Sequence, residues 1–384
     1  MKKLFAIIFV ALFGYVVSYY FVGKAKGYSL IPEGDMDVEE FFEDIGNFFE
    51  HIGDKKVSLD DSLMAADYFQ QGMDLYLSND YENAKWYFYD AYYYNPNFFE
   101  ALFFEGKCNF MTEDYYAAKS SFEELYDVTS DYDSAYYYLG FSNFELEDYP
   151  DAVFYLEIFL EYQPNSVEAL TKSGWAYYKN YQENEAIENV EKSLEIDPKN
   201  IDGHFLLGYI YANNNNYKKS IYHNLIVLNN SSDYYSAAYN TAYSYENLGK
   251  RDSAYYYLEK SLEIKSDYGS AYGFLAELNY KDRLYNNAIV NANNAISIDN
   301  TDGYNFLYRA KSYFALGNFD VAFSDFEEYY YINYNCETLF DMATCQYKLE
   351  NKEDAISYYT DFLSCTDDDE LRAEALIKLE QLQD

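Results

Sequence analysis

The sequence predicts an all-α protein built from stacked helical hairpins, and three regularities support this fold. The first is a small residue that returns every 34 positions along much of the 384-residue chain. A repeat length in this range is typical of proteins in which one structural unit stacks on the next. The residue is glycine at first and alanine later: Gly72, Gly106, Gly140, Gly174, Gly208, Ala242, Ala276 and Ala310.

The second regularity is another small residue, twelve positions after each of the first. Small side chains at this spacing fit the facing sides of two helices in a hairpin, where they let the backbones approach closely. The positions are Ala84, Ala118, Ala152, Ala186, Ser220, Ala254, Ala288 and Ala322.

The third regularity is proline in one register, at Pro96, Pro164 and Pro198. Proline at the end of a unit stops a helix without removing a hydrogen bond that the helix needs. Within the first repeat, which begins at Ala65, apolar residues recur every three or four positions on both sides of a polar turn at 78–80. This pattern predicts a helix, a tight turn and a second helix.

An aromatic residue is predicted to start the second helix of most repeats. Pro150 lies in the first turn of one such helix, where its missing N–H has no partner to lose. The aromatic positions are Tyr81, Tyr115, Tyr149, Tyr217, Tyr285 and Phe319.

This combination of glycine or alanine, aromatic residues, alanine and proline at 34-residue spacing resembles the tetratricopeptide repeat family. The resemblance implies a right-handed α-α solenoid of about nine repeats with capping helices. Eight repeats run from Ala65 to Asn335, the last one residue short, and a ninth completes the array over 65–369. Residues 370–384 are predicted to form a C-terminal capping helix, since the end of a solenoid needs a solvated cover.

The amino-terminal residues 1–26 are predicted to be a signal-anchor or a signal peptide. Lys2 and Lys3 precede an uncharged stretch, residues 4–22, that is long enough to cross a bilayer. The repeats are therefore expected to be membrane-anchored and to face the periplasm or exterior, or to be secreted. Heavy use of Asn, Tyr, Ile and Lys is compatible with an AT-rich bacterial genome.

Residues 27–64 are predicted to be a linker and an amphipathic capping helix. Phenylalanines and isoleucines recur at helical spacing over 38–52, opposite an acidic face. Two roles stay open for this helix. It docks on the first repeat, or it binds a partner or another copy of the chain.

The composition restricts the partners of the protein. With 66 acidic and 27 basic residues, the formal net charge is −39. Nucleic acid is therefore excluded as a partner, because its phosphates would be repelled rather than neutralised. The 51 Tyr and 29 Phe nevertheless supply enough apolar surface for a folded core.

No enzyme chemistry is predicted: the sequence offers no catalytic residues, no metal ligands and no cofactor motif. The histidines His51, His204 and His223 are spread over the chain. Cys108 and Cys345 occupy equivalent core positions and are expected to be packed thiols. Cys336 and Cys365 come to the same end of the ninth hairpin, where they either form a disulfide in an oxidising compartment or remain thiols.

The resemblance implies that the first helices line a concave groove that binds extended peptides or partner helices. It therefore favours a non-enzymatic protein–protein interaction scaffold with a protein or peptide partner. Two alternatives remain: an extracytoplasmic carbohydrate-binding protein, because aromatic rings stack on sugars, and a self-assembling surface or filament subunit. Carried over by repeat position, the ligand-binding residues are Phe103, Phe110, Tyr137, Phe141, Phe144, Trp175, Tyr178, Phe205, Tyr209, Tyr239 and Tyr243.

Overall fold

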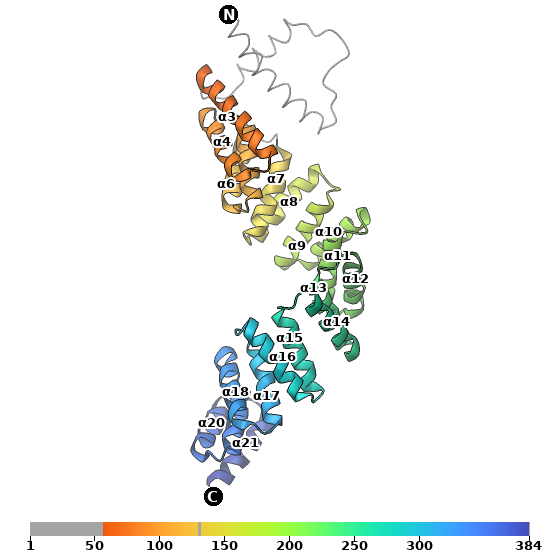
Figure 1. Cartoon of the computed structure of the whole chain (residues 1–384), viewed down its shortest axis with the longest axis vertical. Helices are drawn as coiled ribbons and strands as arrows, with labels where there is room; N and C mark the ends of the chain where they lie inside the picture. Colours follow the sequence, from red (N-terminus) through yellow and green to blue (C-terminus); the bar gives the residue numbers. More distant parts are fainter. Residues whose placement is uncertain (1–56, 130–131, 384) are drawn as a thin grey trace, which may run out of the picture. The chain divides into compact units, whose positions relative to one another are not determined.

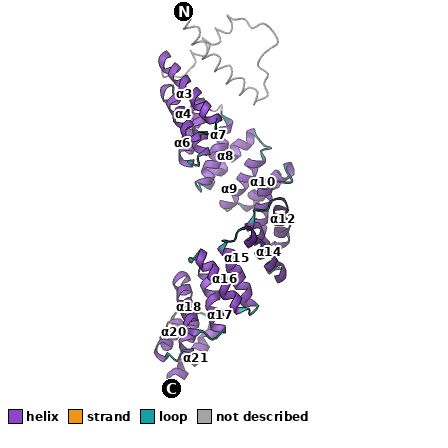
Figure 2. Cartoon of the chain, viewed as in Figure 1, coloured by secondary structure: helices purple, strands orange, loops and turns teal. Residues whose placement is uncertain are grey.

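The computed structural model describes residues 57–129 and 132–383, and all regular secondary structure in these residues is helical (Figures 1 and 2). The chain divides into two compact units, Met1–Ile196 and Asp197–Asp384, which are described separately below. The prediction of an all-α helical repeat solenoid is confirmed. Among the described residues, no helix is both long and apolar enough to cross a membrane.

Unit 1 contains four helical hairpins. Its helices are α3 (Leu59–Leu77), α4 (Tyr81–Tyr94), α5 (Phe99–Met111), α6 (Tyr115–Val128), α7 (Asp133–Glu145), α8 (Tyr149–Tyr162), α9 (Val167–Lys179) and α10 (Glu183–Ile196).

Unit 2 contains five further hairpins and a final helix. Its helices are α11 (Ile201–Asn213), α12 (Tyr217–Asn230), α13 (Tyr235–Asn247), α14 (Arg251–Ile264), α15 (Gly269–Lys281), α16 (Tyr285–Ile298), α17 (Gly303–Ala315), α18 (Phe319–Asn333), α19 (Cys336–Lys348), α20 (Lys352–Cys365) and α21 (Asp369–Gln383).

Each hairpin turns through a residue in the left-handed backbone conformation. Glycine supplies this conformation at Gly249 and Gly317, with φ of 69° and 83°. Elsewhere a residue with a side chain adopts it, although the conformation costs such a residue roughly 1–2 kcal/mol. These residues are Asn79, Glu113, Glu147, Tyr181, Asn215, Arg283 and Glu350.

The glycines of the 34-residue register lie where a second helix packs closely against the first. A Cβ atom at Gly140 would lie 2.5 Å from Cγ of Leu156, and one at Gly72 would lie 2.8 Å from the ring of Phe88. The nearest side chain thus comes from sixteen residues later, whereas the sequence predicted that the glycine faces the small residue twelve positions later. That small residue is itself fully buried, as at Ala84 and Ala152. Both positions must be small for the hairpin to close.

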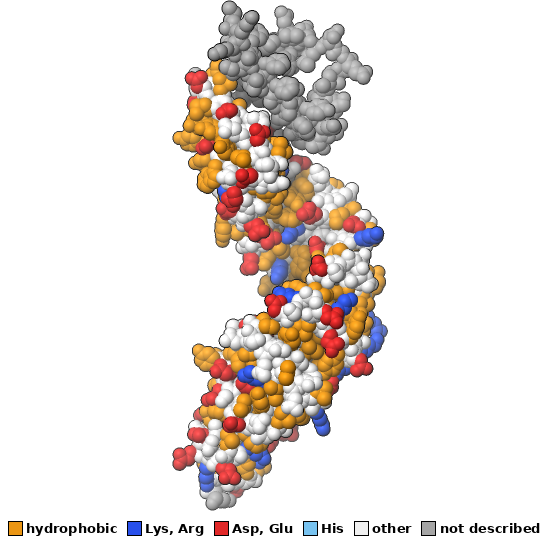
Figure 3. Space-filling model, in the orientation of Figure 1, with side chains coloured by type: hydrophobic (Ala, Val, Ile, Leu, Met, Phe, Trp, Pro, Cys, Tyr) orange, Lys and Arg blue, Asp and Glu red, His pale blue; other side chains and the backbone are white. Residues whose placement is uncertain are grey.

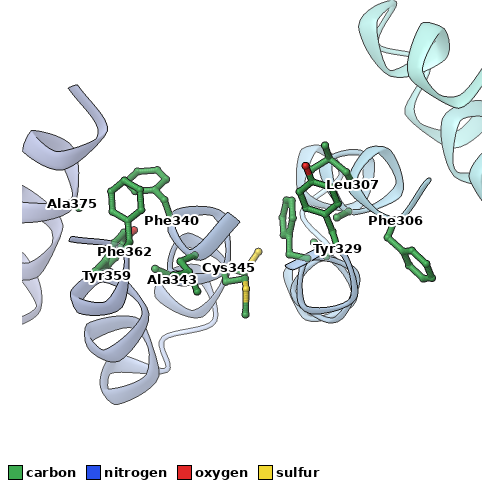
Figure 4. Close-up of a cluster of buried hydrophobic side chains, with 14 residues drawn as sticks. Phe306, Leu307, Tyr329, Phe340, Ala343, Cys345, Tyr359, Phe362 and Ala375 are labelled. Carbon is green, nitrogen blue, oxygen red and sulfur yellow. The ribbon is translucent and has the colours of Figure 1, made fainter. Parts of the chain in front are cut away.

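The core of unit 2 ends in a cluster of rings between the last helices (Figure 4). The rings of Tyr359 and Phe362 on α20 are fully buried. They lie 5.6 and 5.4 Å from the ring of Phe340 on α19. Leucines of α21, including Leu371 and Leu379, pack against this cluster. The last helix therefore covers the end of the array, and Asp368 caps its start by accepting hydrogen bonds from the N–H groups of Glu370 and Leu371.

At the other end, α3 begins at Leu59, six residues before the predicted start of the array at Ala65. The side chain of Ser58 caps it by accepting a hydrogen bond from Asp61 N. Residues 59–64 therefore belong to the first helix and not to the predicted 27–64 segment, because the cap at Ser58 fixes the helix start. The predicted signal or anchor, residues 1–26, and the amphipathic helix at 38–52 lie outside the described residues.

Cys336 and Cys365 form a disulfide with a Cα–Cα distance of 6.0 Å and are therefore not free thiols. The bond joins the start of α19 to the end of α20 and so closes the ninth hairpin. Cys108 and Cys345 are buried thiols, as predicted. Burial raises the pKa of each to about 12.

Candidate binding surface on the first helices

The predicted binding residues of unit 1 lie on three successive first helices. Their spacing of three, four or seven residues within each helix places them on one side of it. We call this set the unit-1 aromatic face: Phe103 and Phe110 on α5, Tyr137, Phe141 and Phe144 on α7, and Trp175 and Tyr178 on α9.

Part of the unit-1 aromatic face holds neighbouring repeats together. The ring of Phe110 on α5 lies 6.4 Å from that of Phe141 on α7. Phe141 also stacks on Tyr137, with ring centroids 4.3 Å apart, and only 7% of it is exposed. Phe103 stacks on Tyr132, from the start of the next repeat, at 5.2 Å. These rings therefore form a packed layer, and their remaining edges are the surface that a ligand can reach.

Lys107 is enclosed by this layer. Its ammonium nitrogen lies 5.1 Å from the ring centroids of both Tyr76 and Phe104, and 5.6 to 5.9 Å from those of Phe103 and Tyr138. Burial opposes its charge, yet the hydroxyls of Tyr138 and Tyr76 outweigh this effect and raise the pKa of Lys107. The cation is thus held by cation–π attraction, and its charge stabilises the fold.

Lys172 makes a similar cation–π contact further along, from a different repeat position. Its ammonium nitrogen lies 4.4 Å from the ring of Phe144 and 4.9 Å from that of Phe141, and it pairs with Glu145 at 3.1 Å. The carboxylate neutralises the cation that borders the surface. Next to it on α9, the partly exposed rings of Trp175 and Tyr178 lie edge to face, 6.5 Å apart.

The remaining predicted residues lie in unit 2, on α11 and α13. Phe205 packs on Tyr234 at 5.5 Å. Tyr239 lies 5.8 Å from Phe274, and burial raises the pKa of its phenol well above the usual value. Tyr209 is partly buried, whereas Tyr243 is 39% exposed. Only Tyr243 of these four projects substantially into solvent.

The sequence prediction missed the role of the two lysines, although a signal for it was present. Lys107 occupies the repeat position of Phe141 and Trp175, and Lys172 occupies that of Tyr138. A lysine among aromatic residues in one register indicates a cation–π contact between neighbouring repeats. The structure places both lysines in such contacts.

A second electrostatic feature of unit 1 lies at Glu105 on α5. Burial, and then the charge of Glu124, raises the pKa of the Glu105 carboxyl to about 7. The Glu124 carboxylate also accepts a 2.8 Å hydrogen bond from the hydroxyl of Tyr92. The folded protein therefore binds a proton at Glu105 more tightly than the unfolded chain does.

The expected consequence is that Glu105→Gln stabilises unit 1 at pH 8. The native pKa is higher than the unfolded value, so wild-type stability falls as the pH rises from about 4.5 to 7. At about 1.4 kcal/mol for each pKa unit, the rise of the pKa from 4.5 to about 7 makes the gain on the order of 3 kcal/mol. Urea unfolding at pH 8 and pH 5 measures it. An equal gain at both pH values would contradict the raised pKa, since the advantage of the variant should shrink towards pH 5.

The two described histidines, which the sequence left unconnected, meet in unit 2. Nδ1 of His204 lies 2.9 Å from Nδ1 of His223, and Nε2 of His204 lies 3.2 Å from the carbonyl oxygen of Pro198. Nε2 donates to that carbonyl oxygen, which can only accept, and in a neutral His204 the Nδ1 atom is then the acceptor of a hydrogen bond from His223. Burial lowers the pKa of His223 to about 4, so the imidazole of His223 is neutral at pH 7. In the described parts of the chain, no three His, Cys, Asp or Glu side chains are grouped to hold a metal ion.

Three family models match separate parts of the chain. A model of the anaphase-promoting complex, cyclosome, subunit 3 matches residues 145–226. Two tetratricopeptide repeat models match residues 235–268 and 337–364. These last matches coincide with the α13–α14 and α19–α20 hairpins. Among proteins of curated function, none matches the chain significantly.

Solved structures with similar folds come from several proteins. PilF of Pseudomonas aeruginosa has a TM-score of 0.50 and 15% identity, over 55% of this chain and 97% of that one. A tetratricopeptide repeat protein from Parabacteroides merdae has a TM-score of 0.47 and 18% identity, over 66% and 99%. YrrB, described as a TPR protein with an unusual peptide-binding site, has a TM-score of 0.34 and 22% identity, over 53% and 88%.

The likeness to PilF supports the helical repeat fold alone, and the family models add the identity of the repeat. Two of them match single hairpins of this structure, and the 34-residue register extends the same unit through the array. The chain is a tetratricopeptide repeat protein.

Proposed function

We propose that this protein is a non-enzymatic scaffold that binds a protein segment along the unit-1 aromatic face. Tetratricopeptide repeat proteins generally bind protein or peptide partners, and the family is typically non-catalytic. The observation that carries the proposal is the pair Trp175 and Tyr178, partly exposed beside Lys172. Rings that are already ordered by packing lose little conformational entropy when a ligand covers them.

The charge of the surroundings favours a neutral or basic segment. Glu145 neutralises the charge of Lys172. The four aromatic rings around Lys107 shield the other cation of the face. An anionic segment would be repelled by a protein of net charge −39. The ligand side chains that fit best are aliphatic, aromatic or basic.

We further propose that the array lies outside the cytoplasm, either anchored by residues 1–26 or released. The Cys336–Cys365 disulfide supports this location, because such bonds persist in oxidising compartments. The uncharged stretch at 4–22 supports it independently.

Replacing Trp175 and Tyr178 together with alanine tests the site. Central aromatic contacts often contribute about 2 kcal/mol each, so the variant should bind its partner at least tenfold more weakly. Partners captured from the native source with wild-type protein are compared with those captured by the variant, after circular dichroism shows an unchanged fold. Retention of the same partners by the variant would refute the proposed site.

A second candidate, carbohydrate binding, is favoured by an exposed row of rings on α4. Trp86, Tyr89 and Tyr93 are 62%, 48% and 67% exposed. Their neighbouring centroids are 6.5 and 6.4 Å apart. Such rings can stack on successive sugars. Trp86→Ala/Tyr89→Ala is therefore the matched control in the capture experiment, and this variant should still capture the protein partners. If the second function is real, the same variant should bind a polysaccharide column more weakly than wild type does.

A further inference from the structure

Unit 2 carries a small basic hollow that stands out on so acidic a protein. It measures about 540 Å³ and is lined by Lys218, Ile221, Tyr245, Leu248 and Lys250. Lys218 and Ile221 come from the start of α12, Tyr245 from the end of α13, and the other two from the turn that leads into α14. We call it the α12–α14 hollow. Figure 3 shows how acidic and basic side chains are otherwise scattered among hydrophobic ones on one face of the molecule.

The floor of the hollow is apolar and ordered. Ile221 is 9% exposed, and Tyr245 stacks on Tyr257 with centroids 5.5 Å apart. Leu248 completes the floor at the end of α13. A fixed apolar surface of this kind suits an aromatic or aliphatic side chain.

The rim of the hollow is cationic, and the ammonium nitrogen of Lys250 lies 5.8 Å from the ring centroid of Tyr245 in the floor. Lys218 and Lys250 are exposed, and neither forms an ion pair with any described residue. By contrast, the adjacent Arg251 pairs with Glu246 and Asp282. No acidic residue lies in the first turn of α12, and the N-caps of α12 and α14 form no side-chain capping hydrogen bond. Two lysines and two uncapped helix starts favour an anion here.

The chain itself contains a segment with the complementary pattern. In residues 38–52, Phe41 and Phe42 lie directly between Glu40 and Glu43. Aromatic side chains flanked by carboxylates match an apolar floor flanked by ammonium groups. We propose that the α12–α14 hollow binds residues 38–52 of a second copy of this chain, so that the protein self-associates.

Binding between copies makes the measured mass rise with concentration, whereas binding within one chain leaves a monomer at every concentration. A mass measurement therefore distinguishes a second copy from the chain's own segment.

A charge swap in the full chain, kept in mild detergent, tests the proposal. Light scattering after size exclusion measures mass against concentration. Lys218→Glu/Lys250→Glu should raise the dissociation constant of the self-complex by roughly tenfold or more. Glu40→Lys/Glu43→Lys should do the same, and an equimolar mixture of these two variants should recover association. Lys192→Glu/Lys199→Glu, which changes the net charge equally away from the hollow, should have little effect.

Two results would overturn the proposal. One is a wild-type protein that stays monomeric at every concentration. The other is association that survives Lys218→Glu/Lys250→Glu, or that the mixed charge-swap variants fail to recover. To guard against misfolding, Leu248→Ala removes floor area without changing charge. It should weaken association while leaving the circular dichroism spectrum unchanged, and undiminished association would count against the hollow.

Discussion

Breaking the Cys336–Cys365 disulfide is expected to lower the free energy of unfolding of the last repeats by about 3–4 kcal/mol. The bond closes a loop with a sequence separation of 29, and cross-linking such a loop restricts the unfolded chain. The effect should be local to α19–α21, because each repeat in an array draws its stability from itself and its neighbours. Hydrogen exchange of α19 and α20, with and without reductant, measures it.

The control for this prediction is Cys336→Ser/Cys365→Ser. This variant should already show the faster exchange and should not respond to reductant. Cys108 and Cys345 do not complicate the comparison, since they are buried and their raised pKa leaves little reactive thiolate at pH 8. If wild type and variant exchanged α19 and α20 at equal rates without reductant, the disulfide would not stabilise the hairpin.

The second large effect is expected at Gly140, where leucine should cost about 3 kcal/mol through overpacking. Even a Cβ atom there would lie 2.5 Å from Cγ of Leu156 and 3.2 Å from its backbone nitrogen. Rotation of the Leu156 side chain cannot relieve the second contact, so α7 and α8 must separate. Urea unfolding followed by circular dichroism gives the loss of stability, and hydrogen exchange should assign it to these two helices.

A double-mutant cycle isolates the cause. Leu156→Ala alone should destabilise by leaving a cavity. In Gly140→Leu/Leu156→Ala the added leucine occupies part of that space, so the combined loss should be smaller than the sum of the two single losses. Strictly additive losses would mean that the two side chains do not compete for the same volume.

The sequence predicted the helix boundaries well because the same boundary signals recur in each repeat, so that an unclear signal in one repeat is resolved by the others. Second helices start at Tyr81, Tyr115 and Tyr149, and the turn at 78–80 falls between Leu77 and Tyr81. The sequence could not predict which side chains contact each other between the two helices of a hairpin. The contact of Gly140 with Leu156 depends on how far the two helices rotate about their axes, and the meeting of His204 with His223 depends on the same rotation in unit 2.

The candidate site was predicted less completely than the fold. Repeat position puts Phe141 and Trp175 in one register, but it does not say that Phe141 is buried while Trp175 stays partly exposed. Packing between repeats decides this, through contacts such as that of Phe141 with Phe110. Whether the aromatic face binds a ligand stays a prediction for the experiments above.

The left-handed residue in the hairpin turns makes the number of repeats an adjustable quantity. Residues as different as Asn79, Glu147, Tyr181 and Arg283 adopt nearly the same φ, between 60° and 64°. The geometry of the turn is thus set by the helices around it and tolerates many side chains. Duplication or loss of 34 residues would therefore join two equivalent turns. Evolution can thus lengthen or shorten such a protein by whole repeats without changing the sequence where the repeats meet.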